Sequence, residues 1–331
     1  MTVVQADGLN VKPIETDEFQ MGVAETYDVI VEPTEAKAFA FVAESIDRSG
    51  QVVATLGPKP GMRAAEPTLR PVPVLTMTDM GMDHSKMGHD MSDGGNMDDM
   101  DHSAMNHSSM KHGAIDHAAP SQAMMGHGPN PNGPAVRLAK VEADIEVGPG
   151  AANVAAMPVN RLDEPGIGLS DVPHRVLTYS QLRSLEPNKD TRKPGREVVV
   201  HLTSNMERYM WSFDGVKFSE VTESIKFMEG ERVRLTLVNN TMMPHPIHLH
   251  GMFFDLVNGG GNHMPRKHTI VVKPSEKLSV DVSAEHVGDW AFHCHLMYHM
   301  HAGMMQVVTV LPNPMTSNAS SHSTMSHEGM Q

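Results

Sequence analysis

The chain has 331 residues, and its 26 Lys and Arg against 40 Asp and Glu give a net charge of −14, which argues against nucleic acid as a partner because phosphate binding needs clustered basic residues. A single Cys excludes an intrachain disulfide framework, and the lack of any apolar run of about 18 residues excludes a membrane-spanning helix. The 29 Met and 21 His far exceed ordinary usage and indicate soft-metal chemistry.

The first residues combine short apolar segments with turn residues. Strands are predicted at TVVQ, YDVIV and FAFVA, with a turn at residues 47–50. This β-meander is too short for a self-sufficient sandwich, so residues 1–75 are predicted to be part of a larger domain, with apolar faces left uncovered. Acidic residues stand where a secretory signal would be basic and apolar, which predicts either a cytosolic protein or a start upstream of Met1.

Residues 76–135 form a low-complexity tract rich in Met, His and Asp. A short unit recurs as MDHSKM at 82–87, MDHSAM at 100–105 and MNHSSM at 105–110. No packed core can be built from this composition, so the tract is predicted to be disordered unless a ligand orders it. Thioethers prefer Cu(I) and imidazole accepts both copper states, which favours copper binding over the alternative of a solvated linker without a metal role. The predicted Cu(I) ligands are Met77, Met80, Met82, His84, Met87, His89, Met91, Met97, Met100, His102, Met105, His107, Met110 and His112.

The rest of the chain divides into a connection, a β-domain and a tail. Residues 136–195 are punctuated by Pro and Gly and are predicted to be a linker with one short helix near residues 180–185. Residues 196–311 carry about seven strand patterns separated by turn residues, which predicts a complete Greek-key sandwich. Residues 312–331 are predicted to be a disordered tail. The expected fold class is all-β, with one complete domain, part of a second and a disordered Met/His-rich insert.

Two histidine-rich segments lie inside the predicted β-domain. In HPIHLHG, the period-two alternation of an extended segment puts His248 and His250 on the opposite side to the first histidine. In HCHLMYHMHAGM, the same alternation puts His293 and His295 on the opposite side to Cys294. Each segment is therefore predicted to serve two different sites.

The two faces collect different ligands. One is expected to gather Cys294, His245, His299 and Met304, and a thiolate, two imidazoles and a thioether are the ligand set of blue-copper electron-transfer sites. The other gathers only imidazoles, which suits copper bound for oxygen chemistry. Zinc is the rival metal because it also takes His and Cys, although one Cys with a suitably spaced Met favours copper. Four other histidines of the domain are expected to be polar loop or strand-end residues: His201, His263, His268 and His286. His301, two residues after His299, is expected to support the ligands without being one.

At these residues the sequence resembles a known family. HPIHLHG and HCHLMYHMHAGM are similar to the third and fourth copper motifs of the multicopper oxidases, and NMERYMWSFDG with NNTMMPHPIHLHGM resembles the copper-resistance members of that family. The opening DGLNVKPIETDEFQMGVAETYDVIVEP resembles the late strands of the family's middle cupredoxin domain. The resemblance implies a cupredoxin-like fold, with residues 1–75 a partial middle domain and residues 196–311 the carboxy-terminal domain.

The resemblance also implies a role for each ligand. Cys294, His293 and His295 would carry electrons from a type 1 copper to a trinuclear copper cluster. The implied ligands are His245, Cys294, His299 and Met304 for the type 1 copper, His248 for the type 2 copper, and His250, His293 and His295 for the type 3 coppers.

The implied activity is oxidation of Cu(I), and of phenols as a further class, with reduction of O2 to water in the periplasm. The family's trinuclear cluster needs four more histidines from two HxH motifs of an amino-terminal cupredoxin domain, and no such motifs remain here. The chain therefore resembles the carboxy-terminal part of such an oxidase, and the missing domain is expected from the same gene or from a separate chain. The alternative is a non-catalytic protein that binds and sequesters copper.

Overall fold

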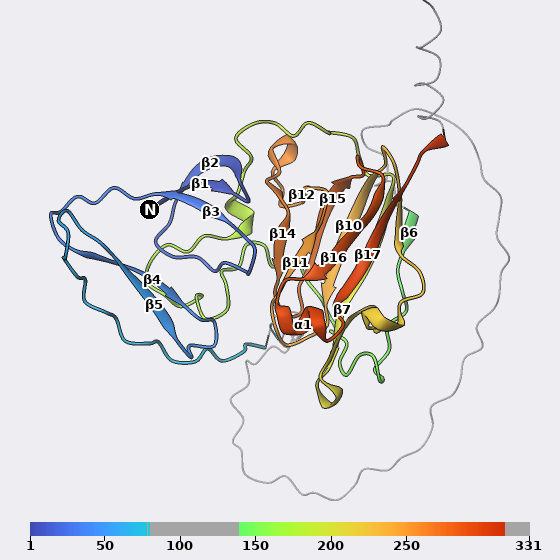
Figure 1. The fold of residues 1–331 in the computed structure, drawn as a ribbon, viewed down its shortest axis with the longest axis horizontal. Coiled ribbons are helices and arrows are strands. Elements are labelled where there is room, and N and C mark those ends of the chain that lie inside the picture. The colour runs from blue at the N-terminus through green and yellow to red at the C-terminus, as the bar shows by residue number, and fades with distance from the viewer. Residues whose placement is uncertain (78, 80–138, 315–331) are drawn as a thin grey trace, which may run out of the picture. The chain divides into compact units, whose positions relative to one another are not determined.

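The computed structural model describes residues 1–77, 79 and 139–314 (Figure 1). Strands predominate in this part of the chain, where the one α-helix is α1 (Met297–His301). The low-complexity tract from residue 80 and the tail from residue 315 lie outside the described residues, so the disorder expected for them stays a prediction. Within the described ranges, no helix is long and apolar enough to cross a membrane.

One large sheet carries the longest strands of the described residues. Its strands are β6 (Ala139–Val141), β7 (Arg196–Asn205), β8 (Met210–Phe213), β10 (Arg232–Asn239), β12 (Phe254–Leu256), β13 (Arg266–Lys267) and β15 (Lys277–Ser283). Their order is β13-β12-β15-β10-β7-β6, and β8 pairs with β7. Strand β10 lies between β7, to which it is parallel, and β15, to which it is antiparallel.

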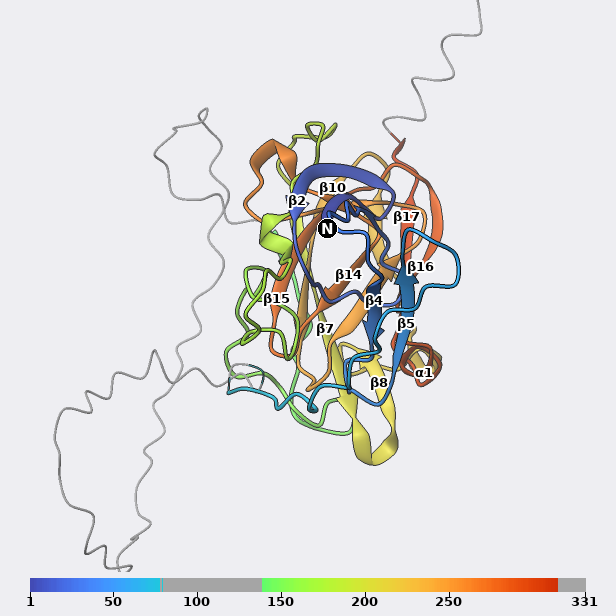
Figure 2. The same cartoon turned by 90° about the vertical axis from the view of Figure 1, so that its left-hand side faces the viewer.

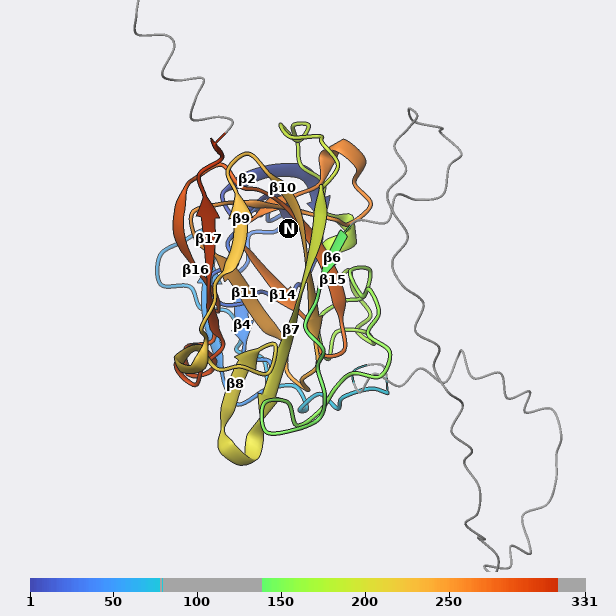
Figure 3. The same ribbon diagram turned by 90° about the vertical axis from the view of Figure 1, so that its right-hand side faces the viewer.

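A second sheet carries both histidine-rich segments. Its strands are β9 (Ile225–Met228), β11 (His245–Leu249), β14 (Thr269–Val272), β16 (Gly288–Cys294) and β17 (Met305–Leu311). Their order is β14-β11-β16-β17-β9, and Figure 3 shows β9 beside β17. Short 3-10 turns lie in the connections at η3 (Met206–Arg208), η4 (Phe218–Glu220) and η5 (Gly261–His263).

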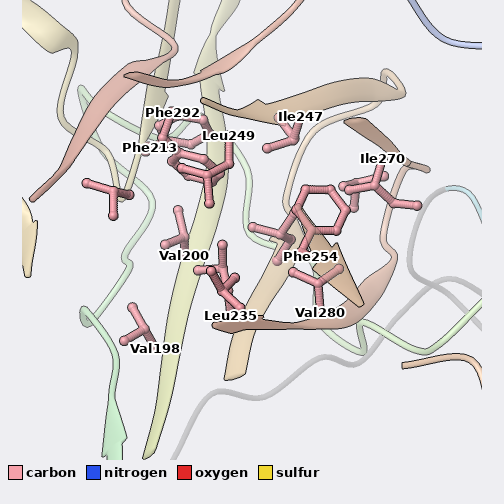
Figure 4. Close-up of a cluster of buried hydrophobic side chains, with 14 of the residues drawn as sticks. Val198, Val200, Phe213, Leu235, Ile247, Leu249, Phe254, Ile270, Val280 and Phe292 are labelled. Atoms are coloured by element: carbon pink, nitrogen blue, oxygen red, sulfur yellow. The ribbon is translucent and has the colours of Figure 1, made fainter. Parts of the chain in front are cut away.

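The two sheets share a hydrophobic core (Figure 4). Alternation along each strand decides which side chains enter it, so Val233, Leu235 and Leu237 of β10 and Ile247 and Leu249 of β11 are all buried. Burial of side chains of this size stabilises the fold by about 1.5–3 kcal/mol each. The core thus holds β11 and its histidines in a fixed register.

The segment predicted to be a linker is part of the packed structure. Leu162 belongs to the main core, and Leu182 is fully buried in a smaller one. The short helix expected near residues 180–185 forms only as one turn of 3-10 helix, η2 (Tyr179–Gln181), and ends before Leu182. The side-chain amide of Asn258 donates to the carbonyl oxygens of Tyr179 and Leu182, at 2.8 Å each, and Leu182 is extended. Tertiary contacts therefore replace helix propagation at this point.

The amino-terminal residues form two small sheets. Strands β1 (Thr2–Ala6), β2 (Leu9–Glu15) and β3 (Tyr27–Ile30) pair in the order β2-β1-β3. Strand β4 (Phe39–Glu44) pairs with β5 (Gln51–Leu56), and Figure 2 shows these two strands side by side. The core under β1 and β2 is small, and it borrows side chains from the former linker: Val3, Ala6, Val11, Leu177 and Leu182. The β4–β5 hairpin leaves Phe41 54% and Val52 73% exposed. Uncovered apolar surface was expected in this part of the chain.

Buried charges join the amino-terminal sheet to β13 and β14. The Nζ of Lys267 lies 3.1 Å from Asp7 Oδ2 and 3.1 Å from Glu25 Oε1, and all three side chains are fully buried. Asp7 Oδ2 also accepts hydrogen bonds from the backbone N–H groups of His268 and Thr269, at 3.0 and 3.2 Å. Strand β14, which pairs with β11, is therefore anchored to residues far away in the sequence.

Candidate metal centres

The register of β11 and β16 brings the two histidine-rich segments together. Ile247 pairs with Cys294, and His248 pairs with His293. Because successive side chains of a strand alternate, Cys294 faces the core with Ile247, whereas the two histidines face the other side of the sheet. One strand pair therefore carries a ligand group on each of its faces.

On the core face, Cys294, His245 and His299 form a buried cluster. Cys294 Sγ lies 3.6 Å from His245 Nδ1 and 3.8 Å from His299 Nδ1, and the two Nδ1 atoms are 3.1 Å apart. Cys294 and His245 are fully buried, and His299 is 5% exposed. The three donor atoms converge within 4.8 Å of one another, which is close enough to ligate one ion.

Helix α1 places His299 opposite Cys294. The chain leaves β16, makes five helical residues and returns through Gly303, whose φ is 123°. A Cβ at Gly303 would lie 2.7 Å from the carbonyl oxygen of Trp211, so a side chain there would push α1 away from β8. Hydrogen bonds from Met304 N–H to the His299 carbonyl, 2.9 Å, and from Cys294 N–H to the Met304 carbonyl, 3.1 Å, close the loop.

Burial controls the protonation of this cluster. It raises the pKa of the Cys294 thiol to about 12, lowers the pKa of His299 to about 4 and holds that of His245 well below its usual value. The imidazoles are therefore neutral and able to ligate at pH 7. The thiolate needs a cation beside it, so proton release from Cys294 is coupled to metal binding.

On the other face, four histidines form a second cluster: His248, His250, His293 and His295. Their ring centroids are 4.7 Å apart for His248 and His250, and 5.3 Å apart for His293 and His295. His250 Nε2 and His293 Nε2 approach to 3.1 Å. His250 is exposed and His293 is 7% exposed, so this cluster opens towards the surface more than the first one does.

Backbone carbonyl groups orient the rings of the second cluster. His248 Nδ1 lies 2.7 Å from the carbonyl oxygen of His268, and His293 Nδ1 lies 3.0 Å from that of Cys294. A carbonyl oxygen only accepts, so Nδ1 carries the proton and Nε2 keeps a lone pair for a metal. Burial lowers the pKa of His248 to about 4 and also lowers that of His293, which keeps both rings neutral. Both donor sets thus fit copper.

Three side chains at these clusters had no role in the sequence-based prediction. Trp211 stacks on His299 with ring centroids 3.7 Å apart and planes 17° apart, and it is buried. Thr241 Oγ1 lies 2.7 Å from His245 Nε2. The His268 ring lies 5.2 Å from that of His248, although His268 was expected to be a polar loop or strand-end residue. A tryptophan, a threonine and an isolated histidine carry no ligand pattern in sequence, so only the geometry identifies them.

The other predicted residues are placed as follows. Met304 is fully buried in the main core, and its backbone bonds to both Cys294 and His299. His201 lies beside Glu142, and His263 beside the carbonyl oxygen of Ser184. Met77 is 42% exposed, whereas every other predicted Cu(I) ligand of the tract lies outside the described residues.

Comparisons with known proteins agree with this geometry. Two family models described as multicopper oxidase match residues 191–314 and 1–58. Copper resistance protein A of Escherichia coli is 45% identical over 94% of this chain and 52% of its own length. A copper resistance protein A homolog of Pseudomonas syringae pv. tomato is 46% identical over 94% of this chain and 50% of its own length. The chain spans about half the length of the curated relatives it matches.

A solved structure shares the fold of the described residues. Fet3p, described as a multicopper oxidase that functions in iron import, matches with a TM-score of 0.54 and 16% identity over 99% of this chain and 54% of that chain. The expected all-β, cupredoxin-like fold is thereby confirmed, and the group of His245, Cys294 and His299 resembles a type 1 copper site. The chain belongs to the multicopper oxidase family, whose members bind copper, and its resemblance to the copper-resistance members is confirmed.

Proposed function

We propose that this chain supplies the electron-entry part of a copper-resistance oxidase. The proposed substrates are Cu(I), with phenols as a second class, and dioxygen. When bound, copper would supply one-electron redox chemistry, so that four electrons and four protons convert one dioxygen to two waters. The chain's own residues bind the metal, exclude water from the entry site and connect it to the second site.

The observation that supports this proposal most directly is the position of Cys294 between the two clusters. Its side chain belongs to the buried cluster, and its two neighbours in sequence, His293 and His295, belong to the four-histidine cluster. Only a few covalent bonds separate the thiolate from either imidazole. A protein that only stores copper has no need for such a connection.

The proposed ligand roles follow the two donor sets. His245, Cys294 and His299, with the thioether of Met304 as a further ligand, would hold a type 1 copper. The thiolate and burial suit a site that exchanges electrons without binding substrate. His248 would hold a type 2 copper, and His250, His293 and His295 would hold type 3 coppers.

A further domain is part of the proposal. The second cluster has four histidines, and the four more that the family's trinuclear cluster needs would come from this further domain. The apolar residues exposed on the β4–β5 hairpin give that domain a surface to cover. We propose a partial middle cupredoxin domain at residues 1–75, a copper-binding tract at 76–135 and a carboxy-terminal cupredoxin domain at 196–311. The connection at 136–195, predicted to be a linker, packs in the cores of both domains. The tract would gather Cu(I), and the proposed compartment is the periplasm.

Oxygen consumption tests this proposal. The chain is mixed with an amino-terminal cupredoxin domain from a copper resistance protein A, loaded with copper and supplied with Cu(I) in an oxygen electrode cell. We expect oxygen uptake that depends on both components and on Cys294, with Cys294→Ser as the matched control. A fully metallated pair that takes up no oxygen would contradict the oxidase function.

A second candidate function is copper sequestration without turnover. Its support is that the described residues bring together four histidines at the second cluster, while the Met-rich tract adds further soft ligands. In that case the chain would bind several copper ions per molecule, and the added domain would change neither the stoichiometry nor oxygen consumption. The number of copper ions bound per molecule, measured for the chain alone and for the chain with the added domain, distinguishes the two functions.

A further inference from the structure

The hydroxyl of Thr241 contacts His245 through the ring nitrogen that does not face Cys294. Thr241 Oγ1 lies 2.7 Å from His245 Nε2, whereas His245 Nδ1 lies 3.6 Å from Cys294 Sγ. Thr241 is 3% exposed and His245 is fully buried, so water does not compete for this contact. The hydrogen bond therefore decides which ring nitrogen carries the proton.

An inventory of hydrogen-bonding groups gives the direction of this bond. A threonine hydroxyl has one proton to donate and two lone pairs that accept. Its proton can go to the Met243 carbonyl oxygen, 3.2 Å away, and one lone pair accepts from the Met243 N–H, also at 3.2 Å. The second lone pair is left for a proton on His245 Nε2. If the hydroxyl instead donated its proton to His245 Nε2, its hydrogen bond to the Met243 carbonyl oxygen would be lost, and the threonine would make one hydrogen bond fewer.

A buried amide holds this loop in shape. Asn239, the last residue of β10, accepts from the Thr241 N–H at 2.9 Å. Its Nδ2 donates to the carbonyl oxygens of Met243, at 2.7 Å, and Val272, at 3.0 Å. Val272 is the β14 partner of His245. The Met243 carbonyl oxygen, which accepts the hydroxyl proton, is thus held through β10 and β14, and β14 also positions the His245 imidazole.

We propose that Thr241 is a positioning residue that accepts the Nε2 proton of His245 and keeps the Nδ1 lone pair directed at Cys294 and His299. This inference deepens the proposed function, on which its copper readouts rest. In the metal-free chain, His299 Nδ1–H can donate to that lone pair across their 3.1 Å separation. His245 is then ready for ligation before copper arrives, because it needs no tautomer change.

Nitrogen NMR of the metal-free, full-length chain tests the inference without copper. Histidines are labelled with nitrogen-15, and the His245 signals are assigned by their loss in His245→Gln. We expect His245 to be protonated at Nε2, and Thr241→Val to lower the ratio of Nε2–H to Nδ1–H forms about tenfold, which corresponds to about 1.4 kcal/mol. Thr241→Ser should restore the wild-type ratio.

Thr236 provides a matched control. It is another fully buried threonine, and its hydroxyl bonds to Glu197 and Ser279 instead of a histidine. Thr236→Val should leave the His245 signals unchanged. A wild-type His245 protonated at Nδ1, or an unchanged ratio in Thr241→Val, would overturn the inference. Should Thr241→Val fail to fold, the wild-type spectrum alone decides.

Copper loading supplies the second readout. Thr241→Val should raise the reduction potential of copper bound at Cys294, because an imidazole without a partner for Nε2–H donates less charge, and Thr241→Ser should return it. An unchanged potential in Thr241→Val would contradict the inference even if the proposed function holds. An Nε2–H tautomer in a chain that forms no thiolate–copper band would support the role of Thr241 and contradict the proposed function.

Discussion

The two histidine clusters share one strand pair but differ in burial and in the ring nitrogen that they leave free. In the buried cluster, Nδ1 of His245 and His299 face Cys294. In the more open cluster, carbonyl oxygens hold Nδ1 of His248 and His293, which leaves Nε2 free to ligate. Strand alternation separates the two sets, but the neighbouring backbone and hydroxyl groups decide how each ring can ligate.

The largest expected effect is on the free energy of unfolding, at the buried charges that join the amino-terminal sheet to β13 and β14. Lys267→Met leaves the carboxylates of Asp7 and Glu25 buried without their cation, and we expect it to lower the free energy of unfolding by about 3–5 kcal/mol. Denaturant titration of the metal-free chain measures this. Lys37→Met removes an exposed pair with Glu35 and should change stability by less than about 0.5 kcal/mol. Similar losses in both variants would contradict a structural role for the buried charges.

Loss of one ligand from each cluster should separate their copper sites. His245→Gln should weaken copper at the buried cluster by more than about 100-fold and leave the open cluster unchanged, since the two sets share no side chain. His293→Gln should do the reverse, so each variant is the control for the other. Competition with a chelator of known affinity measures both. Parallel losses in both variants would mean that the clusters form a single site.

Acidification should destabilise the metal-free chain through its buried imidazoles. His248 and His299 have a pKa of about 4 when folded, against 6.5 ordinarily, so between these values the unfolded chain binds more protons. The free energy of unfolding should therefore fall as the pH drops from 6.5 towards 4. Asp214 opposes this trend, because burial raises its pKa to about 6 and its protonation favours the folded chain.

Denaturant titrations at pH 7 and pH 5 measure this dependence. His299→Phe keeps a flat ring against Trp211 but cannot be protonated, so its loss of stability between the two pH values should be smaller than that of the wild type. Equal losses in both chains would show that His299 is not a source of the pH dependence.

The smallest change concerns the thioether of the buried cluster. Met304 is fully buried, and Met304→Leu keeps its volume but removes the sulfur. We expect the thiolate–copper band to remain and the reduction potential to rise by about 60 mV, which is a tenfold shift between the two copper states. Potentiometric titration measures this change. A potential equal to that of the wild type would exclude Met304 as a ligand.

The sequence predicted the strands and the sorting of the histidines well, because both follow from period-two alternation. The sequence assigned His248 and His293 to the same kind of face, and the structure adds the register that pairs them. The sequence placed the helix near residues 180–185 too far along the chain, because it ends before Leu182, where the side-chain amide of Asn258 donates to the carbonyl oxygens of Tyr179 and Leu182. That contact joins residues far apart in the chain, which local patterns do not report.

The supporting residues of the buried cluster were not predictable in the same way. Trp211 lies on β8 and Thr241 in the loop after β10, and neither residue type marks a ligand. Their roles depend on the close approach of β8, α1 and the loop, which Gly303 permits. A ligand can be predicted from its chemistry, whereas a residue that orients a ligand is found from packing.

Visible absorption during titration with Cu(II) tests the central claim, that Cys294 ligates copper with His245 and His299. We predict an intense blue or green band that grows to one equivalent in the wild-type chain, since thiolate-to-copper charge transfer produces it. Cys294→Ser, in which the hydroxyl cannot serve as a thiolate, should bind Cu(II) at the open cluster without this band. A band that survives Cys294→Ser, or a wild-type chain that binds Cu(II) without any band, would contradict the account.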